Sequence, residues 1–297
     1  MAGMNKKFTG IINYLDYKRT VIKLLYWGCF IALLILAFIC IVPPVWVILS
    51  SLKDIKEFYQ IPPTIIPKTF HPEKLMESWN MLHFGTIYIN TLEMIAGALC
   101  FSVVFNGMAG YVISRLKPMG SKLIFTLMLW TLMLPTSVSM VTVYKNVISL
   151  PILHINLSNS YLPLFLMAGA NAFFVLIFKG FFDGIPTSLI EAARIDGCND
   201  FSIFFRVVMP LSKPVIMTVI ILQLNTTWGD FFWPYLILNN PDKYTVMVEI
   251  YRLIGTQGFS ADLQIVSLTF AIIPPAILFM LFQKHIMQGM TMSGIKG

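Results

Sequence analysis

The polar residues with the most distinctive spacing lie in the segment 191–197, within a chain that is otherwise mostly apolar. Its charged and small members are Glu191, Ala192, Ala193, Arg194 and Asp196. Glu191 follows Ser188 by three residues, a spacing typical of a capping box, in which the two residues satisfy each other's backbone N–H groups. Gly197 suits the left-handed conformation that ends many helices. The pattern predicts a short helix over 189–196 and then a glycine turn.

A second short helix is expected directly after this glycine. Asp200 can serve as its N-cap, and the residues that follow it are mostly apolar. Pro210 and Pro214 end it, because proline cannot donate the hydrogen bond that continues a helix. By itself this helix–turn–helix pattern also fits an ordinary helical hairpin, in which Glu191 caps and Gly197 turns.

Isolated polar side chains within the apolar segments form the second candidate set. Four of them, between residues 223 and 230, recur at helical spacing and predict a polar stripe on one helix. Such a stripe lines a polar path, or it bonds helices together, an interaction often worth only about 0.6 kcal/mol. The sequence leaves both readings open. The candidate path residues are Thr136, Ser139, Asn171, Gln223, Thr226, Thr227 and Asp230.

The sequence disfavours several other chemistries. It contains no G-x-x-x-x-G-K-[ST] phosphate loop, so the chain is not expected to bind ATP in that manner. It contains no H-E-x-x-H motif, and its four cysteines lack the spacing of a metal site or a disulfide framework. We therefore expect no catalytic residue, no metal site and no cofactor bound by this chain.

The composition indicates that these residues are positioned by membrane-spanning helices. The 297 residues are 57% hydrophobic and only 12% charged, whereas soluble domains are about 25% charged. About 20 apolar residues cross the bilayer core, where backbone groups must be bonded within each segment. The sequence thus predicts an all-α membrane protein with six transmembrane helices. Their approximate bounds are 25–50, 89–114, 123–147, 161–178, 214–238 and 263–283.

The basic residues are distributed unevenly around these spans. Lys and Arg number 14 in the two terminal segments and in 115–122 and 179–213, against six in the opposite loops. By the positive-inside rule, both termini lie in the cytoplasm, so the net charge of +7 sets topology and is not a nucleic-acid footprint. The first apolar run is too long for a signal peptide. The expected organisation is a cytoplasmic arm over 1–24, a six-helix domain over 25–283 that includes the loop 186–213, and a cytoplasmic tail over 284–297.

Two loops on the opposite side of the membrane are longer than a turn requires. The prolines of 51–87 favour an extended, non-helical path. The loop 239–262 opens with a turn signal and includes a segment that can form a short helix.

The complete pattern of the charged loop resembles the EAA loop of ATP-binding-cassette (ABC) importer permeases. It reads Glu-Ala-Ala at 191–193, then Gly197, and after nine intervening residues Val-Val-Met-Pro at 207–210. Val207 and Met209 stand where Ile and Leu are commoner. Four further stretches are similar to maltose-type carbohydrate-uptake permeases, specifically to the smaller, six-span partner of the pair. They are Asn90-Thr91-Leu92, Leu132-Met133-Leu134-Pro135, the segment 228–234 and the tail 288–297.

The resemblance implies a role for each of these segments. The loop is then a coupling helix that docks in a cleft of a separate ATPase, through Glu191, Ala192, Ala193, Arg194, Asp196, Gly197 and Pro210. The tail is expected to insert between two ATPase copies, through Gly289, Thr291, Ser293 and Gly294.

The resemblance also implies an assembly and a function. The partners are a second, homologous permease, an ABC ATPase dimer that binds ATP and Mg, and an extracytoplasmic sugar-binding protein. The chain is then a non-enzymatic permease subunit in the bacterial inner membrane, importing an oligosaccharide or related sugar by alternating access. Two alternatives remain: an ABC permease for another solute, such as a polyamine, phosphonate or amino acid, and an ion-coupled secondary transporter.

Overall fold

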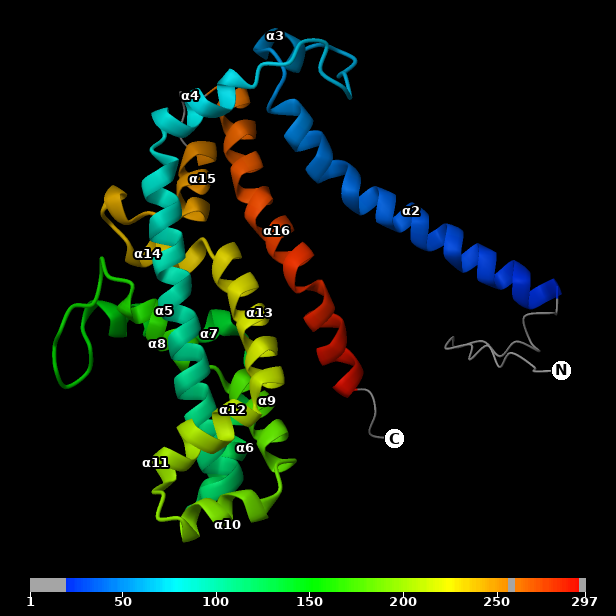
Figure 1. Ribbon diagram of the computed structural model, residues 1–297. Coiled ribbons are helices and arrows are strands. Elements are labelled where there is room, and N and C mark those ends of the chain that lie inside the picture. The colour runs from blue at the N-terminus through cyan, green and yellow to red at the C-terminus, as the bar shows by residue number, and fades with distance from the viewer. Residues whose placement is uncertain (1–19, 256–259, 294–297) are drawn as a thin grey trace. The chain divides into compact units, whose positions relative to one another are not determined.

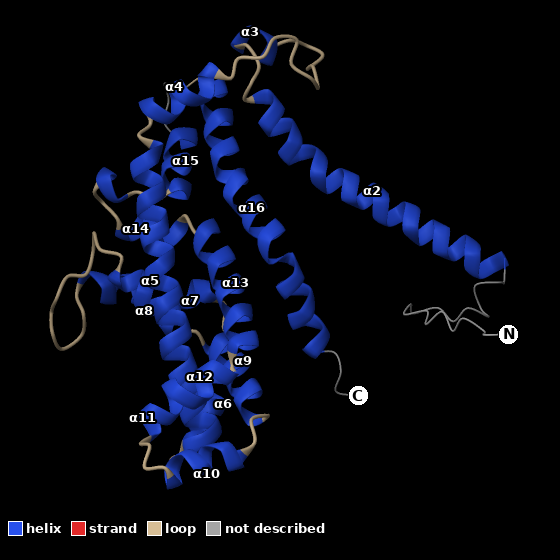
Figure 2. Cartoon of the chain, viewed as in Figure 1, coloured by secondary structure: helices blue, strands red, loops and turns tan. Residues whose placement is uncertain are grey.

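The computed structural model describes residues 20–255 and 260–293, with side chains described as far as residue 282. Throughout these residues all regular structure is helical, and Figure 2 shows only helices and connecting loops. This confirms the predicted all-α fold. The chain forms two compact units, Met1–Lys74 and Leu75–Gly297.

The first unit contains α2 (Thr20–Ser50) and α3 (Ile55–Phe58). With 31 residues, α2 is long and apolar enough to cross a membrane. The chain after α3 runs without regular structure to residue 72, as its prolines predict. It is held around the buried Glu57, whose carboxylate accepts hydrogen bonds from the Thr64 hydroxyl at 2.6 Å and the Lys68 backbone N–H at 3.0 Å.

Helices begin earlier than the sequence predicts at the start of the second unit. α4 (Glu73–Met81) and α5 (Phe84–Tyr111) fill most of 73–88, where an extended loop and a later helix start were expected. That expectation was wrong because the prolines stop at residue 72 and none follows before residue 118. The last turn of α5 continues into a π-helix, η1 (Val112–Leu116).

Three predicted spans consist of two helices each. They are α6 (Ser121–Thr131) with α7 (Thr136–Ile148), α8 (Leu162–Gly169) with α9 (Ala172–Asp183), and α13 (Lys213–Gly229) with α14 (Phe232–Ile237). The first pair bends by 107° and the second by 43°. The prediction of one continuous helix for each span was therefore wrong. At the first break Pro135 is extended and has no N–H to donate; at the others, polar side chains bond the backbone of the following helix.

The loop 239–262 has the short helix that its sequence suggests. It contains a 3₁₀ turn, η3 (Pro241–Lys243), and then α15 (Val246–Gly255). The last helix is α16 (Ala261–Ser293). Among the described residues, three helices can cross a membrane by length and composition, or up to six if three bent pairs each count as one span. The third of these pairs is Asp200–Leu211 with Lys213–Gly229, bent by 83°, and not α13 with α14.

Helix α5 lies at the centre of the second unit and packs against α8, α9 and α13, and α13 packs against α16 (Figure 1). α5 approaches α9 tightly at Gly110. A Cβ at this position would stand 2.8 Å from Phe178 Cβ and 3.1 Å from the Lys179 backbone nitrogen. Only glycine allows the two backbones to pack this tightly.

Gly110→Ala is expected to destabilise the protein by about 1–3 kcal/mol, because the new methyl group forces α9 away from α5. The measurement is thermal unfolding of the purified chain in detergent. Gly107→Ala is the matched control on the same helix, since the nearest atom to its Cβ, Phe204 Cζ, is 3.4 Å away. Equal midpoints for the two variants would contradict the close packing.

Candidate functional site

The charged loop begins with α10 (Thr187–Ile195). Pro186 is the N-cap, and no side chain caps this helix. The expected capping box of Ser188 and Glu191 is therefore absent. The physical reason is register: the helix begins at Thr187, so Ser188 lies inside the first turn instead of preceding it.

Gly197 ends α10 as predicted. Its φ is +82°, in the left-handed region. Backbone N–H groups close the helix end, from Gly197 to the Arg194 carbonyl and from Cys198 to the Ala193 carbonyl, both at 3.0 Å. The turn thus fixes the direction in which the chain leaves α10.

The second helix of the loop is present but divided into α11 (Asp200–Ile203), the π-helix η2 (Phe204–Val208) and α12 (Met209–Leu211). Pro210 lies within α12. Asn199 is the N-cap and accepts from the Ser202 N–H at 2.8 Å, so the prediction of Asp200 as the cap was wrong. Asp200 instead bonds Arg194 across the turn at 2.9 Å. This bond and the charge of Asp200 raise the pKa of the Arg194 guanidinium.

The loop has a buried face and an exposed face. The buried side chains join a core with Tyr111 of α5 and Phe178 and Phe182 of α9; they are Ile190, Ala193, Ile203, Phe204 and Val208. Glu191, Ala192, Arg194 and Asp196 are exposed, as is Ile195 at 86%. Of the two alanines, only Ala192 lies on the exposed face. Ala193 packs into the core of this chain, where there is room for a small side chain.

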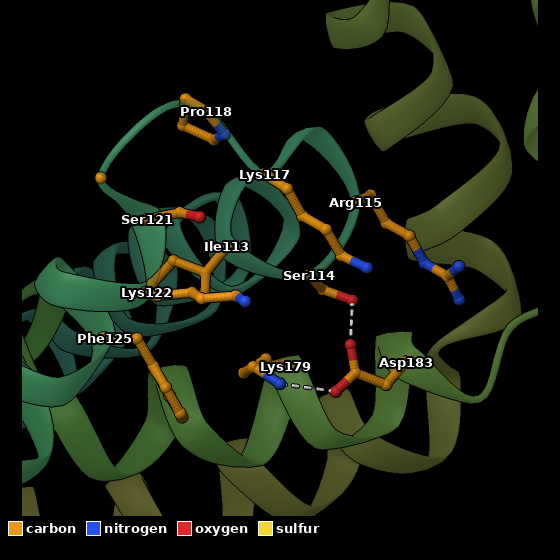
Figure 3. A pocket seen from close by; sticks show the side chains of 11 residues that line it. Ile113, Ser114, Arg115, Lys117, Pro118, Ser121, Lys122, Phe125, Lys179 and Asp183 are labelled. Atoms are coloured by element: carbon orange, nitrogen blue, oxygen red, sulfur yellow. Dashed lines mark hydrogen bonds and ion pairs between the residues drawn. The ribbon is translucent and has the colours of Figure 1, made fainter.

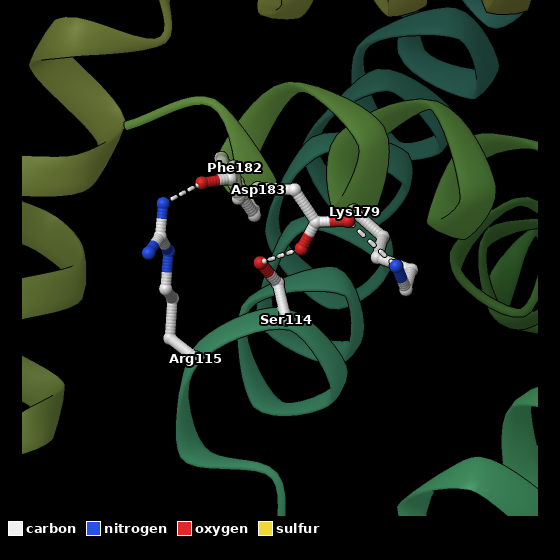
Figure 4. A network of polar contacts seen from close by, with 5 residues as sticks. All are labelled: Ser114, Arg115, Lys179, Phe182 and Asp183. Carbon is white, nitrogen blue, oxygen red and sulfur yellow. Dashed lines mark hydrogen bonds and ion pairs between the residues drawn. The ribbon is translucent and has the colours of Figure 1, made fainter. Parts of the chain in front are cut away.

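A polar network that the sequence analysis missed anchors the start of this loop (Figure 4). Arg115 donates to the backbone carbonyls of Phe182 and Ile185, at the end of α9 and just before α10. Asp183 accepts from the Ser114 hydroxyl and from Lys179, each at 2.6 Å. The end of α5 is thereby bonded to the connection between α9 and α10. Since Ser114 and Arg115 are 67–70 residues away from their partners in sequence, spacing could not reveal these bonds.

The predicted polar stripe on α13 does not behave as one surface. Gln223 and Thr227 are buried, and the Gln223 amide donates to the Thr227 hydroxyl at 2.7 Å. Asp230 accepts from the backbone N–H groups of Phe232 and Trp233 at 3.0 and 3.3 Å, so it holds the first turn of α14. Thr226 is exposed beside Asn225, which the sequence analysis did not single out. Thr136 and Ser139 are also exposed, on α7.

Asn171 lies at the break between α8 and α9. Its side chain accepts from the Phe173 N–H at 3.0 Å and caps α9. Its own backbone N–H donates at 2.9 Å to Asn106 of α5, whose amide also donates to the Ala168 carbonyl at 2.9 Å. Asn106 is fully buried and bonds the backbone groups that the helix break leaves without partners. The sequence analysis missed this residue; the one signal for it was an asparagine inside the apolar run of α5.

Asn90 and Thr91, both on α5, bond the backbone of residues 242–246, which lead into α15. The Asn90 amide donates to the carbonyls of Asp242 and Tyr244 at 2.7 and 3.1 Å. The Thr91 hydroxyl accepts from the Val246 N–H at 3.0 Å, where α15 begins.

The tail residues are only partly described. Gly289, Thr291 and Ser293 lie on the backbone of α16, which continues to Ser293, but their side-chain surroundings are outside the described part of the chain. Gly294 lies outside the described residues altogether.

Comparisons with known proteins agree on one family. Residues 84–292 match the family described as "Binding-protein-dependent transport system inner membrane component". The arabinooligosaccharides transport system permease protein AraQ of Halalkalibacterium halodurans is 29% identical over 283 residues, 94% of this chain and 100% of the relative. AraQ of Bacillus subtilis is 33% identical over 217 residues, 72% of this chain and 75% of the relative.

A solved structure shares the fold. It is the crystal structure of a bacterial ABC transporter involved in the import of the acidic polysaccharide alginate. The TM-score is 0.77 at 20% sequence identity, covering 93% of this chain and 99% of the other.

Proposed function

The chain belongs to the family of binding-protein-dependent transport system inner membrane components, and we propose that it imports an oligosaccharide or related sugar by alternating access. It is a multi-pass permease subunit of an ABC importer in the inner membrane. The sugar class is proposed from the two arabinooligosaccharide relatives, whose matches cover 94% and 72% of this chain.

The observation that carries the coupling role is the two-faced loop α10–α12. Its buried face shares one core with α5 and α9, and Arg115 bonds the connection that enters it. A force applied to the exposed face is therefore transmitted to the bundle, because packed cores move as rigid bodies. We assign this exposed face, with Glu191, Ala192, Arg194 and Asp196, to contact with the ATPase.

The proposed contact combines polar and apolar side chains. Ile195 is 86% exposed and Phe201 is 63% exposed, on the two sides of the Gly197 turn. Apolar side chains beside charged ones suit a protein interface, in which an apolar centre is surrounded by a polar rim. Closure of the ATPase dimer on ATP would move two such loops together and open the bundle outward.

The remaining roles follow from this assignment. A second permease completes the pathway, an extracytoplasmic binding protein delivers the sugar, and ATP and Mg bind in the ATPase partner. From the distribution of basic residues we assign both termini to the cytoplasm. The path is assigned to the exposed Thr136, Ser139 and Thr226, whereas Asn171, Gln223, Thr227 and Asp230 stabilise the helices that form it.

The test is to purify the tagged chain from its native membrane, identify the proteins that accompany it, and reconstitute the complex in proteoliposomes. We expect an ABC ATPase and a second permease, with ATP hydrolysis stimulated by a binding protein loaded with arabinooligosaccharide. A complex stimulated by a polyamine-, phosphonate- or amino-acid-loaded protein identifies another solute. Solute uptake driven by an ion gradient without an ATPase indicates a secondary transporter.

The tail gives a separate prediction within the same complex. A cysteine at Ser293, in a background lacking the four native cysteines, is expected to crosslink to the interface between the two ATPase copies when nucleotide is bound. The crosslink should weaken without nucleotide, since the copies then separate. No crosslink in either state, together with full transport after deletion of 289–297, would contradict the tail assignment.

A further inference from the structure

A basic pocket lies beside the network that anchors the charged loop (Figure 3). It has a volume of about 650 Å³ and is formed where η1, the start of α6 and the end of α9 meet. Four cationic side chains and one carboxylate line it: Arg115, Lys117, Lys122, Lys179 and Asp183. The pocket therefore favours an anionic ligand.

The single carboxylate does not neutralise this charge. Asp183 is already bonded to Ser114 and Lys179. Among the side chains that the structure describes, no carboxylate lies within ion-pair distance of Lys117 or Lys122. Figure 3 shows the Lys179 ammonium bonded to Asp183, and the side chains of Lys117 and Lys122 on the wall formed by the turn before α6 and by α6 itself, so these two lysines remain available to a ligand.

The backbone adds to the positive potential. α6 begins at Ser121 on the pocket wall, and no side chain caps its N-terminus. The first N–H groups of a helix and its dipole attract phosphate groups. The lysines and this helix start are therefore suited to the same ligand group.

The pocket and its surroundings suit an amphiphilic ligand, because apolar side chains lie beside the basic ones. Ile113 and Phe125 supply an apolar part of its wall. The helix α6 that leads away from it carries exposed apolar side chains, Leu123 at 64%, Ile124 at 52%, Leu127 at 46% and Trp130 at 60%. A ligand with a phosphate head and acyl chains satisfies both parts, which a free phosphate ion does not.

We propose that this pocket binds the headgroup of an anionic phospholipid, with the acyl chains lying along α6. The proposal rests on the cytoplasmic placement of the charged loop, since basic pockets on that side of the membrane bind anionic lipid headgroups. A lipid bound there contacts the residues that hold the α9–α10 connection, and so supports the position of the loop.

The experiment measures lipid binding to the delipidated full-length chain in detergent by native mass spectrometry. Phosphatidylglycerol is expected to bind more tightly than phosphatidylcholine. The double variant Lys117→Gln/Lys122→Gln should weaken phosphatidylglycerol binding about thirtyfold, taking about 1 kcal/mol for each lysine. Lys117→Arg/Lys122→Arg should retain it. Arg206→Gln/Lys213→Gln, which removes two exposed charges from the loop outside the pocket, is the matched control and should change it little.

Equal loss in the control pair, or no loss in the pocket pair, would overturn the site. Displacement of the lipid by millimolar inorganic phosphate would show a free-phosphate site and overturn the lipid assignment. Because binding is measured on the isolated chain, it does not depend on transport, and its failure is distinguishable from failure of the proposed importer function.

Discussion

Gly197→Pro is expected to reduce ATP-dependent uptake to background while the chain still inserts in the membrane. Gly197 has φ +82°, and proline is restricted to a φ of about −65°. The substitution also removes the N–H that bonds the Arg194 carbonyl at 3.0 Å. The chain must then leave α10 in another direction. The exposed face of α10 is then misplaced relative to the core that the loop shares with α5 and α9.

Two alanine variants, Gly197→Ala and Gly180→Ala, separate the effect of positive φ from the effect of replacing a glycine. A Cβ at Gly197 or at Gly180 meets no atom within 4 Å, so neither variant creates a clash. Only position 197 has a positive φ, and an L-residue there costs about 1–2 kcal/mol. Gly197→Ala should reduce uptake partially and Gly180→Ala should not. Normal uptake by Gly197→Pro, with normal amounts in the membrane, would refute the coupling role.

Asn106→Leu is expected to prevent stable folding of the α8–α9 region. The variant leaves the Ala168 carbonyl and the Asn171 N–H without their partner in an apolar interior. Each unsatisfied buried group costs about 1–3 kcal/mol, so the two together cost about 2–6 kcal/mol, against a total stability of about 5–15 kcal/mol for a typical domain. The measurement is thermal unfolding in nanodiscs combined with hydrogen exchange of the amides in 168–175.

Ser102→Ala is the control for this prediction. Ser102 is also fully buried, but it only accepts a longer bond of 3.3 Å from the Asn106 amide. Both bonds across the helix break remain in that variant, so we expect a loss of about 1 kcal/mol or less. If Asn106→Leu unfolds at the same temperature as Ser102→Ala and its amides stay protected, Asn106 does not stabilise the break.

The sequence by itself determined the features that depend on local physics. Apolar runs identified the membrane-spanning segments, because backbone in lipid must be helical. Gly197 predicted the end of α10, because the residue that ends a helix in the left-handed conformation is usually glycine; its φ is +82°. The spacing from Glu191 to Pro210 also identified the family, which the match over 84–292 confirms.

Two local predictions failed by one or two residues. Ser188 and Asp200 were both expected to cap helices, yet Pro186 precedes α10 and Asn199 caps α11. Several residues in each stretch have capping propensity, and the helix start is set by how its apolar face meets the core. Ile190 and Ile203 are buried in the same cluster, and that packing fixes the register.

Only the tertiary structure decided which polar side chains form hydrogen bonds inside the fold and which remain exposed. Gln223 and Thr226 both fit one stripe by spacing, but Gln223 bonds Thr227 inside the fold while Thr226 is exposed. Arg115 and Asn106 bond backbone groups 62–70 residues away, and no sequence period encodes such a pairing. Helix breaks free backbone groups whose partners come from another helix, so their positions depend on packing across the bundle.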